Sequence, residues 1–446
     1  MSKSVAPDEN SIAVGFFLTS IVSLGRSFDS SQGFLEPLYP IIAREGSNSL
    51  LNTVLTAVST KIWSMWRNPT TKTFHTPHIP FTKALRRLQS ALKNPSETSR
   101  DVTVLSIILM HFYESIASRA LQQQTSRAHQ DGARALLEHE ADSVHDWDCR
   151  GYVKTYLRHC DVSTYLEFQP TDTSSLDAWF EMAGEDSMPA SPNAILDLIG
   201  LSIVNLQKRL DGIQNPLRND SSGVYELDTW WQDLRRVEEQ LLDWENVVPA
   251  SWLPFTRIVE KAVSLSGLCD LYLTVQIATI WNVWRICRLL VVQMKLSLRQ
   301  KISDHVLEQI TTMAAEDDIS SALSSGKELV DSMCRSLPFY VGNRQTNKGI
   351  YDMENADVVI PSYHDDDLDE EIRSRYRRSG QAMSLQDYRL HILVQGPTHA
   401  LLHLNSLTKV LDSEGGQLLC QALGEDQVLW IRQQFRRVSL LVNPHA

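Results

Sequence analysis

No two of the six cysteines in this 446-residue sequence are spaced as the C-x-x-C pair of a structural zinc site. The six are scattered, several of them within apolar stretches. Scattered thiols are typical of reduced core residues in intracellular proteins rather than of a disulfide framework. We therefore expect neither a structural zinc ion nor disulfide bonds at Cys149, Cys160, Cys269, Cys287, Cys334 and Cys420.

An excess of basic charge is also lacking. Lys and Arg number 42 against 54 Asp and Glu, so the formal net charge is -12. A domain that holds DNA by itself usually presents a basic face, because neutralising phosphates dominates the affinity. We expect no direct DNA contact from this chain.

Sequence signatures of common active sites are missing as well. The chain has no G-x-G-x-x-G motif, no Walker-type phosphate loop and no G-x-S-x-G elbow. We therefore predict no catalytic residues, no cofactor and no enzymatic activity, while a helical enzyme of secondary metabolism stays an open alternative.

Two long apolar stretches need to be weighed as targeting or membrane segments. The stretch 12–24 lacks a basic leading segment and a convincing cleavage site, so it does not favour a signal peptide. The stretch 265–294 is interrupted by Asp270, Arg285 and Arg288, which a membrane-spanning helix would rarely tolerate. We expect a buried helix there and no membrane contact.

Apolar residues recur instead at helical spacing, whereas alternating strand patterns joined by Asn-Gly or Asp-Gly turns are nearly absent. The pattern predicts helices after Pro80, from an N-cap at Asp101, after Pro192 and from Gly396-Pro397, and a pair of long helices within 255–303. The fold class we predict is all-α, a large multi-helix domain of packed antiparallel helices with partial solenoid character. We expect a flexible tail at residues 1–10, one helical domain over residues 11–440, and mobile inserts at 171–192 and 343–381.

Histidines and cysteines offer one candidate metal site. None of their spacings matches a known closed site, so we interpret them as surface and half-buried residues and predict no metal. The group comprises His75, His78, His139, His145, Cys149, His159 and Cys160.

A mixed-charge segment at 364–378 offers a second candidate. Its acidic run Asp365–Asp367 lacks the alternating layout of a calcium loop, and four arginines follow it, so a solvated charge run is favoured. A docking or phosphorylation-controlled loop, with Ser374 and Ser379 beside arginines, stays a further hypothesis.

Tryptophans offer a third candidate, the wall of a small-molecule cavity. Their helical spacing favours core packing instead for Trp230, Trp231, Trp244, Trp281 and Trp284. Arg285 and Arg288 lie on the same predicted helix as the last two. A buried arginine needs a carboxylate or several carbonyl groups as partners, and Glu114 and Glu138 are the carboxylates that we predict for that role.

The order of several helical blocks resembles a known family, the fungal-specific transcription factor domain that follows binuclear zinc clusters. The clearest block is the W-N-x-x-R-x-x-R pattern from Trp281 to Arg288. Further blocks that resemble the family are Phe34–Pro40, Leu50–Ser59, Phe81–Leu92, Asp101–Glu114, His129–Leu137, Leu241–Pro254 and Cys334–Phe339.

This resemblance implies regulation of transcription in the nucleus, through a partner protein or a small effector, with homodimerisation as a further expectation. The family's zinc cluster has no counterpart among these cysteines, so DNA reading does not carry over. An adaptor or repressor that pairs with full-length relatives is an alternative, and so is a gene model that has lost an upstream zinc-cluster exon. The family supplies no catalytic residue, and the effector contacts are unknown at this stage.

Overall fold

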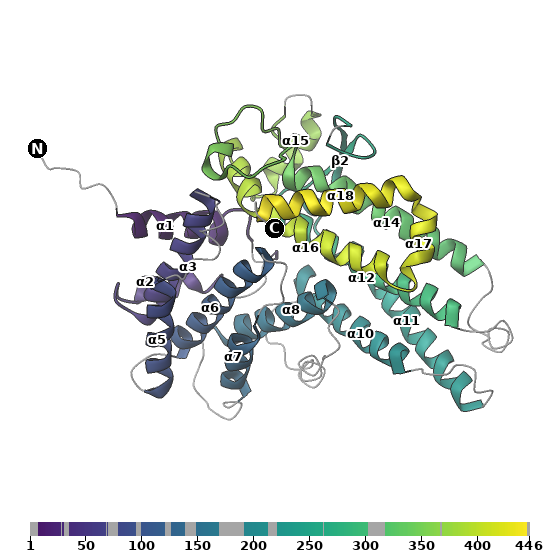
Figure 1. Ribbon diagram of the computed structural model, residues 1–446, viewed down its shortest axis with the longest axis horizontal. Helices are drawn as coiled ribbons and strands as arrows, with labels where there is room; N and C mark the ends of the chain where they lie inside the picture. The colour runs from purple at the N-terminus through teal and green to yellow at the C-terminus, as the bar shows by residue number, and fades with distance from the viewer. Residues whose placement is uncertain are drawn as a thin grey trace, which may run out of the picture.

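Helices form nearly all of the regular structure in the computed structural model (Figure 1). The structure describes residues 8–27, 29–30, 35–67, 69, 79–94, 100–120, 126–138, 149–168, 191–212, 221–261, 263–301, 317–365 and 368–443. Within these ranges there are fifteen α-helices and two short strands, so the predicted all-α class is confirmed.

In the first half of the chain, every regular element that the structure describes is a helix. Its elements are α1 (Glu9–Phe17), the π-helical turn η1 (Leu18–Ser23), α2 (Leu38–Arg44), α3 (Leu50–Arg67), α5 (Ile79–Lys93), α6 (Arg100–Ala120), α7 (Ala128–Glu138), α8 (Arg150–Phe168) and α10 (Pro192–Gly212).

The second half adds the two strands and the longest helices. Its elements are α11 (Ser221–Val247), η3 (Ala250–Trp252), β1 (Phe255–Ile258), β2 (Leu268–Leu271), α12 (Val275–Lys301), α14 (Asp317–Val341), η4 (Gly349–Asp352), α15 (Glu370–Arg378), α16 (Leu385–Asp412), α17 (Gly416–Leu423) and α18 (Glu425–Val442).

Helices that follow one another in the chain pack side by side from α3 to α12, through α5, α6, α7, α8, α10 and α11. Figure 1 shows α5 to α11 as a row along one side of the molecule. Such neighbour-to-neighbour packing is the geometry of a helical solenoid. The row is closed on its other side by α14, α16 and α18, which is why the solenoid character is only partial.

Helix α16 lies at the centre and contacts η1, α8, α12, α14, α17 and α18. At Gly396 it approaches α14 so closely that an added Cβ would lie 2.1 Å from the carbonyl oxygen of Tyr340. We predicted that Gly396-Pro397 begins a helix. This was wrong: Pro397 lies inside α16, which begins at Leu385.

The segment 255–303 also differs from its prediction as a pair of long helices. It contains one helix, α12, preceded by an antiparallel pairing of β1 with β2. The Thr256 hydroxyl donates a hydrogen bond to Asp270 Oδ1 at 2.6 Å across the two strands. Helix α14 packs against β2, and Arg335 Nε lies 3.3 Å from the same Asp270 oxygen. Contacts from α14 thus support a hairpin that would be marginal alone.

By length and apolarity α12 is the one helix among the described residues that resembles a membrane span. Of its most apolar window, 89% is buried inside the protein. This agrees with its prediction as a buried helix.

The N-terminal boundary is corrected in part. Residues 1–7 lie outside the described residues, but Glu9 and Asn10 belong to α1 rather than to a tail. Asp8 caps this helix by accepting a hydrogen bond from Ser11 N at 2.7 Å. The apolar side chains of the 12–24 stretch then pack on α3, and Ala13 and Phe17 are fully buried.

The two predicted inserts have different outcomes. Residues 171–190 lie outside the described residues. The segment 343–381 contains two short helices, η4 and α15, between irregular stretches. Helix α16 binds this segment: Arg389 donates hydrogen bonds of 2.8–2.9 Å to four of its carbonyl oxygens, those of Asp352, Met353, Asn355 and Val358. The mobility of both inserts stays a prediction.

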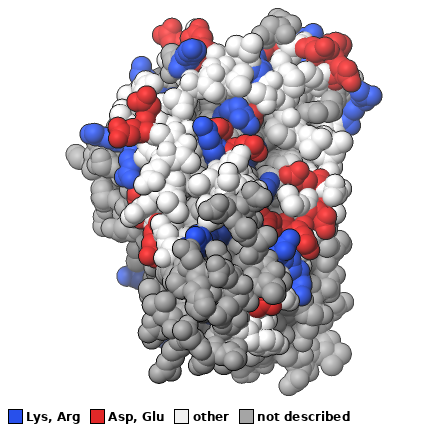
Figure 2. Space-filling view, turned by 90° about the vertical axis from the view of Figure 1, so that its right-hand side faces the viewer, with Lys and Arg blue, Asp and Glu red and all other residues white. Residues whose placement is uncertain are grey.

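Figure 2 shows the charges on the side of the molecule that lies at the right of Figure 1. In the described part of this face, Lys and Arg form small groups beside Asp and Glu rather than one continuous basic surface. A phosphate backbone would need such a surface. The described part of this face therefore has no continuous basic surface of that kind.

Candidate ligand-binding cavity

A cavity of about 180 Å³ lies where η1, α3, α6 and the last helix α18 meet α16. We call it the Arg26 cavity. Its walls come from residues that are up to about 420 positions apart in the sequence, namely Ile21, Arg26, Ile62, Met65, Trp66, Phe112, Ile116, Asn347, Leu393, Val394, Gln395, Pro397, Thr398, His399, Leu441 and Val442.

Most of the wall is apolar, and helical spacing explains how it forms. On α3, Ile62 and Trp66 are four residues apart, and on α6 the same spacing separates Phe112 and Ile116. Residues four apart share one helix face, so each helix presents a short apolar stripe. Leu441 of α18 is fully buried and adds a third apolar side.

Arg26 is the fixed positive charge in this wall. Its Nε donates to the carbonyl oxygen of Ile21 at 2.8 Å. Its two terminal amino groups donate no hydrogen bond and form no ion pair within the described residues. Burial lowers the pKa of Arg26 from its ordinary value of 12.5, and the charge of Glu36 opposes this shift. An arginine stays protonated at any physiological pH, so the cavity wall carries a permanent positive charge with unused hydrogen-bond donors.

A buried polar network lies beside the cavity and joins three segments. The Gln276 amide of α12 donates to Gln395 Oε1 of α16 at 2.7 Å, and Gln395 in turn donates to the carbonyl oxygen of Ser20 in η1. The backbone N–H of Val275 donates to His391 Nε2 at 2.9 Å. The network fixes the N-terminal segment against α12 and α16, and thereby the position of Arg26.

His391 is fully buried in this network, and its pKa is lowered to about 3. Burial is the larger cause, since it penalises the charged imidazolium, and the nearby positive charge of Arg26 acts in the same direction. His391 is therefore neutral at physiological pH, and Nε2 serves as an acceptor.

Another polar group of the wall, Asn347, ties the cavity to the C-terminal helix. Its Nδ2 donates to the carbonyl oxygen of Leu441 at 2.8 Å, and its Oδ1 accepts from Gly349 N at 2.8 Å. Asn347 is thus held in place by the backbone on both sides.

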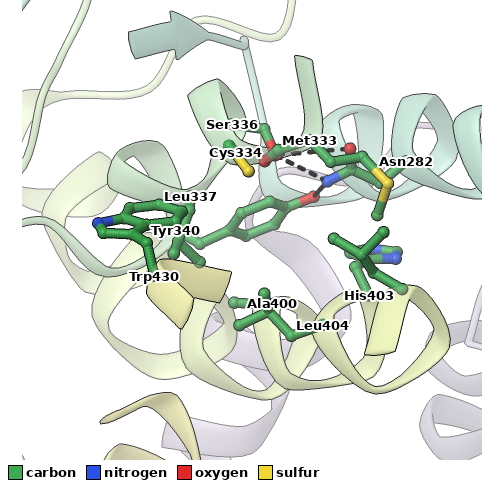
Figure 3. A pocket seen from close by; sticks show the side chains of 11 residues that line it. Asn282, Met333, Cys334, Ser336, Leu337, Tyr340, Ala400, His403, Leu404 and Trp430 are labelled. Carbon is green, nitrogen blue, oxygen red and sulfur yellow. Dashed lines mark hydrogen bonds between the residues drawn. The ribbon is translucent and has the colours of Figure 1, made fainter. Parts of the chain in front are cut away.

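A second hollow lies between α12, α14 and α16 and is shown in Figure 3. In this view the Tyr340 ring extends toward Asn282, whose Nδ2 donates to Tyr340 Oη at 3.2 Å and to Ser336 Oγ at 3.0 Å. The hollow has a volume of only about 10 Å³, about enough for one water molecule. These polar groups satisfy one another, so the arrangement is a structural one.

The candidate metal ligands do not come together in the described residues. His75, His78, His139 and His145 lie outside those residues. No group of three or more His, Cys, Asp or Glu side chains that could hold a metal ion occurs among the positions that the structure describes.

The remaining candidates have protein partners. His159 Nδ1 lies 3.0 Å from Asp197 Oδ1. Cys149 donates from Sγ to Asp101 Oδ1 at 2.8 Å. Asp101 is thus one residue inside α6, contacting a distant cysteine, rather than the N-cap that we predicted. All six cysteines lie in the described part of the chain, and none of them forms a disulfide.

The tryptophan prediction is confirmed, because all five rings are buried core residues outside the Arg26 cavity. Trp244, Trp281 and Trp284 pack on one another with ring centroids 5.3–6.1 Å apart. Each of the three also donates its indole N–H to a backbone carbonyl oxygen at 2.7–2.8 Å. This is how buried tryptophans satisfy their one polar group.

The predicted carboxylate partner of Arg285 is wrong for Glu114, which instead pairs with His129 at 3.3 Å. The Glu138 side chain lies outside the described residues. Arg285 donates from Nη1 to Asn282 Oδ1 at 2.7 Å, and its guanidinium lies 5.8 Å from the centroid of the Trp281 ring. A neutral amide and an aromatic face thus replace the expected anion.

Within the acidic run, Asp365 forms an ion pair with Arg257 of β1. Asp366 and Asp367 lie outside the described residues. Ser379 donates to the carbonyl oxygen of Tyr376 at 2.6 Å, as in a helix end. The hypothesis of a docking loop stays untested.

No family model, no curated protein and no solved structure matches this chain.

Sequence reasoning missed the Arg26 cavity, and left the effector contacts unknown. One signal was present: Arg26 closes an otherwise apolar stretch, and follows a glycine. Its meaning depends on walls supplied by α3, α6, α16 and α18, which no local pattern could bring together.

Proposed function

We propose that this chain regulates transcription as a regulatory helical domain of the fungal zinc-cluster type, and that a small effector in the Arg26 cavity sets its activity. The resemblance in the sequence supports the first half of the proposal. Two of the resembling blocks fall on buried helices, the block from Trp281 to Arg288 on α12 and the block from Cys334 to Phe339 on α14.

The observation that carries the second half is the composition of the cavity wall. The wall combines η1 and α3 from one end of the chain with α16 and α18 from the other. A ligand that contacts all four favours the packing in which they are closed together. Effector binding would thus shift the balance between two helical packings, which is a common basis for regulation.

A tethering experiment tests this function. The full chain is fused to an unrelated DNA-binding domain, and a reporter gene carrying its site is measured in fungal cells. We expect the tethered chain to raise or lower reporter expression several-fold. We also expect M65W, which fills the cavity from α3, to change that effect. L429W is the matched control, because it adds the same ring at a position on α18 that is 55% exposed.

A tethered chain that leaves the reporter unchanged, while accumulating in the nucleus at normal level, contradicts a direct role in transcription. Co-purification with a zinc-cluster protein would in that case favour the adaptor alternative. A reporter effect that M65W and L429W leave equally intact would refute the role of the cavity.

A further inference from the structure

We propose that the Arg26 cavity binds a small organic carboxylate, with the carboxylate on the Arg26 guanidinium and an apolar body against α3, α6 and α18. This inference deepens the proposed function by naming the class of its ligand, and it rests on that function only for the regulatory consequence.

The charge of the ligand follows from the unused donors of Arg26. A guanidinium that lines a mostly apolar cavity has lost part of its hydration, and it regains stability by binding an anion. Among the described residues, only Nε of Arg26 donates a hydrogen bond, to the Ile21 carbonyl oxygen. The two terminal amino groups therefore have the fork geometry that matches a carboxylate with two parallel hydrogen bonds.

The nearest opposite charge inside the protein does not occupy this place. Glu36 acts on Arg26 through its charge, but the two side chains form no ion pair within 4.0 Å among the described contacts. Glu36 Oε2 is buried and has no hydrogen-bond partner. Arg26 and Glu36 are thus close enough to interact through their charges, but they form no hydrogen bond or ion pair among the described residues. A ligand carboxylate bonded directly to the guanidinium would therefore interact with Arg26 more strongly than Glu36 does.

The size and polarity of the cavity define the rest of the ligand. Its volume of about 180 Å³ is close to that of the roughly 150 Å³ cavity that admits benzene. A single ring or a branched chain of similar size fits, whereas a nucleotide or a sterol does not. A phosphate dianion is disfavoured, because Arg26 is the only arginine or lysine among the wall residues and the remaining wall offers mainly side chains such as Trp66, Phe112 and Leu441.

Calorimetry on the purified full chain tests the proposal, with benzoate as probe and benzyl alcohol as its neutral counterpart of nearly equal shape. We expect benzoate to bind at least about tenfold more tightly, in line with a hydrogen bond to a charged group. R26M should abolish this preference, and R26K should retain part of it. E36Q should strengthen benzoate binding, because it removes the competing negative charge. M65W should prevent binding of both probes, and L429W should not.

Three results would overturn the proposal: benzyl alcohol binding as tightly as benzoate, no binding of benzoate, or a preference for benzoate that persists in folded R26M. If R26M fails to fold by circular dichroism, the two probes on the wild-type chain together with M65W still decide. Benzoate binding without any reporter effect of the tethered chain would leave this inference standing and remove the proposed function. A reporter effect that M65W changes, without any benzoate binding, would overturn this inference and leave the proposed function standing.

Discussion

Arg344 donates a hydrogen bond from Nη1 to the carbonyl oxygen of Leu393 at 3.3 Å. This carbonyl lies four residues before Pro397, which has no N–H to donate, so the helix itself leaves it without its usual partner. Arg344 thus compensates for a proline in the middle of α16, next to the Arg26 cavity. The same guanidinium donates from Nη2 to Asp352 Oδ2 at 2.8 Å, and the two side chains are only 1% and 2% exposed.

We expect R344M to lower the free energy of unfolding by about 3–5 kcal/mol, because it leaves the buried Asp352 carboxylate without its cation. Urea denaturation measures the change. The matched control is R432M, whose ion pair with Asp412 is 55% exposed on both sides, and which should cost less than about 1 kcal/mol. Equal losses of stability in the two variants would show that the buried Arg344–Asp352 pair contributes no more to folding than an exposed ion pair does.

Acid should destabilise the protein through His391. Its pKa is about 3 in the folded protein and about 6.5 when unfolded. Between these values the unfolded chain binds more protons, so stability falls as the pH falls from about 6.5 toward 3. The expected contribution is about 2 kcal/mol between pH 6.5 and pH 5.

The measurement is urea denaturation at several pH values, for the wild type and for H391Q, which retains a side-chain acceptor but does not titrate. The acid slope of H391Q should be shallower by about one proton. Parallel slopes in the two proteins would contradict a neutral buried His391.

Gly25 is expected to tolerate no side chain. Its φ is +73°, and an added Cβ would lie 2.4 Å from His391 Cε1. We expect G25A to lower the free energy of unfolding by about 1–3 kcal/mol through backbone strain and displacement of the ring. It should also weaken benzoate binding, because Arg26 is the next residue.

Gly15 provides the matched control for this substitution. It lies in α1, and an added Cβ there would meet no atom within 4 Å. G15A should raise stability by about 0.5–1 kcal/mol, because alanine favours a helix more than glycine does. If G25A were as stable as G15A, the turn before Arg26 would not be held against His391.

The buried thiols are expected to be unreactive while the protein is folded. Burial raises the pKa of both Cys287 and Cys334 to about 12, so hardly any thiolate is present at neutral pH. At pH 8 we expect iodoacetamide to label these two residues only after addition of urea, and to label half-buried Cys420 earlier. Mass spectrometry of tryptic peptides gives the order. Early labelling of Cys287 in the folded protein would contradict its place in the core.

The helices themselves were largely predictable because their evidence is local. In α11, apolar residues spaced by threes and fours predict one buried face, and Leu227, Leu234 and Leu241 are each at most 2% exposed. Helical spacing also gives a wrong prediction of burial where the neighbouring helix does not cover the whole apolar face. In α5 the helical spacing of Leu85, Leu88 and Leu92 predicts one apolar face. Leu92 is nevertheless 48% exposed, and the smaller Ala84 and Ala91 are buried instead.

The positions of Pro397 and Arg285 show that the sequence does not predict which distant residue will be the partner of a buried polar group. A proline in mid-helix is unfavourable on local grounds, so Gly396-Pro397 was assigned to a helix start. Arg344, more than fifty residues away, makes the continuous helix tenable by bonding the orphaned carbonyl oxygen of Leu393. The partner of Arg285 was mistaken for the same reason, since only the packed structure places an amide and a tryptophan ring around it.

Periodicity and cysteine spacing are properties of residues close together in the chain, so they predict the all-α class, the buried tryptophans and the scattered thiols directly. The position of Arg26 depends instead on how helices distant in the sequence pack. Its environment consists of helices from both ends of the chain, and their approach depends on long-range contacts such as the one between Gln395 and Ser20. The sequence places a lone arginine after an apolar stretch, but only the packed helices enclose it in a cavity and leave its two terminal amino groups without a partner among the described residues.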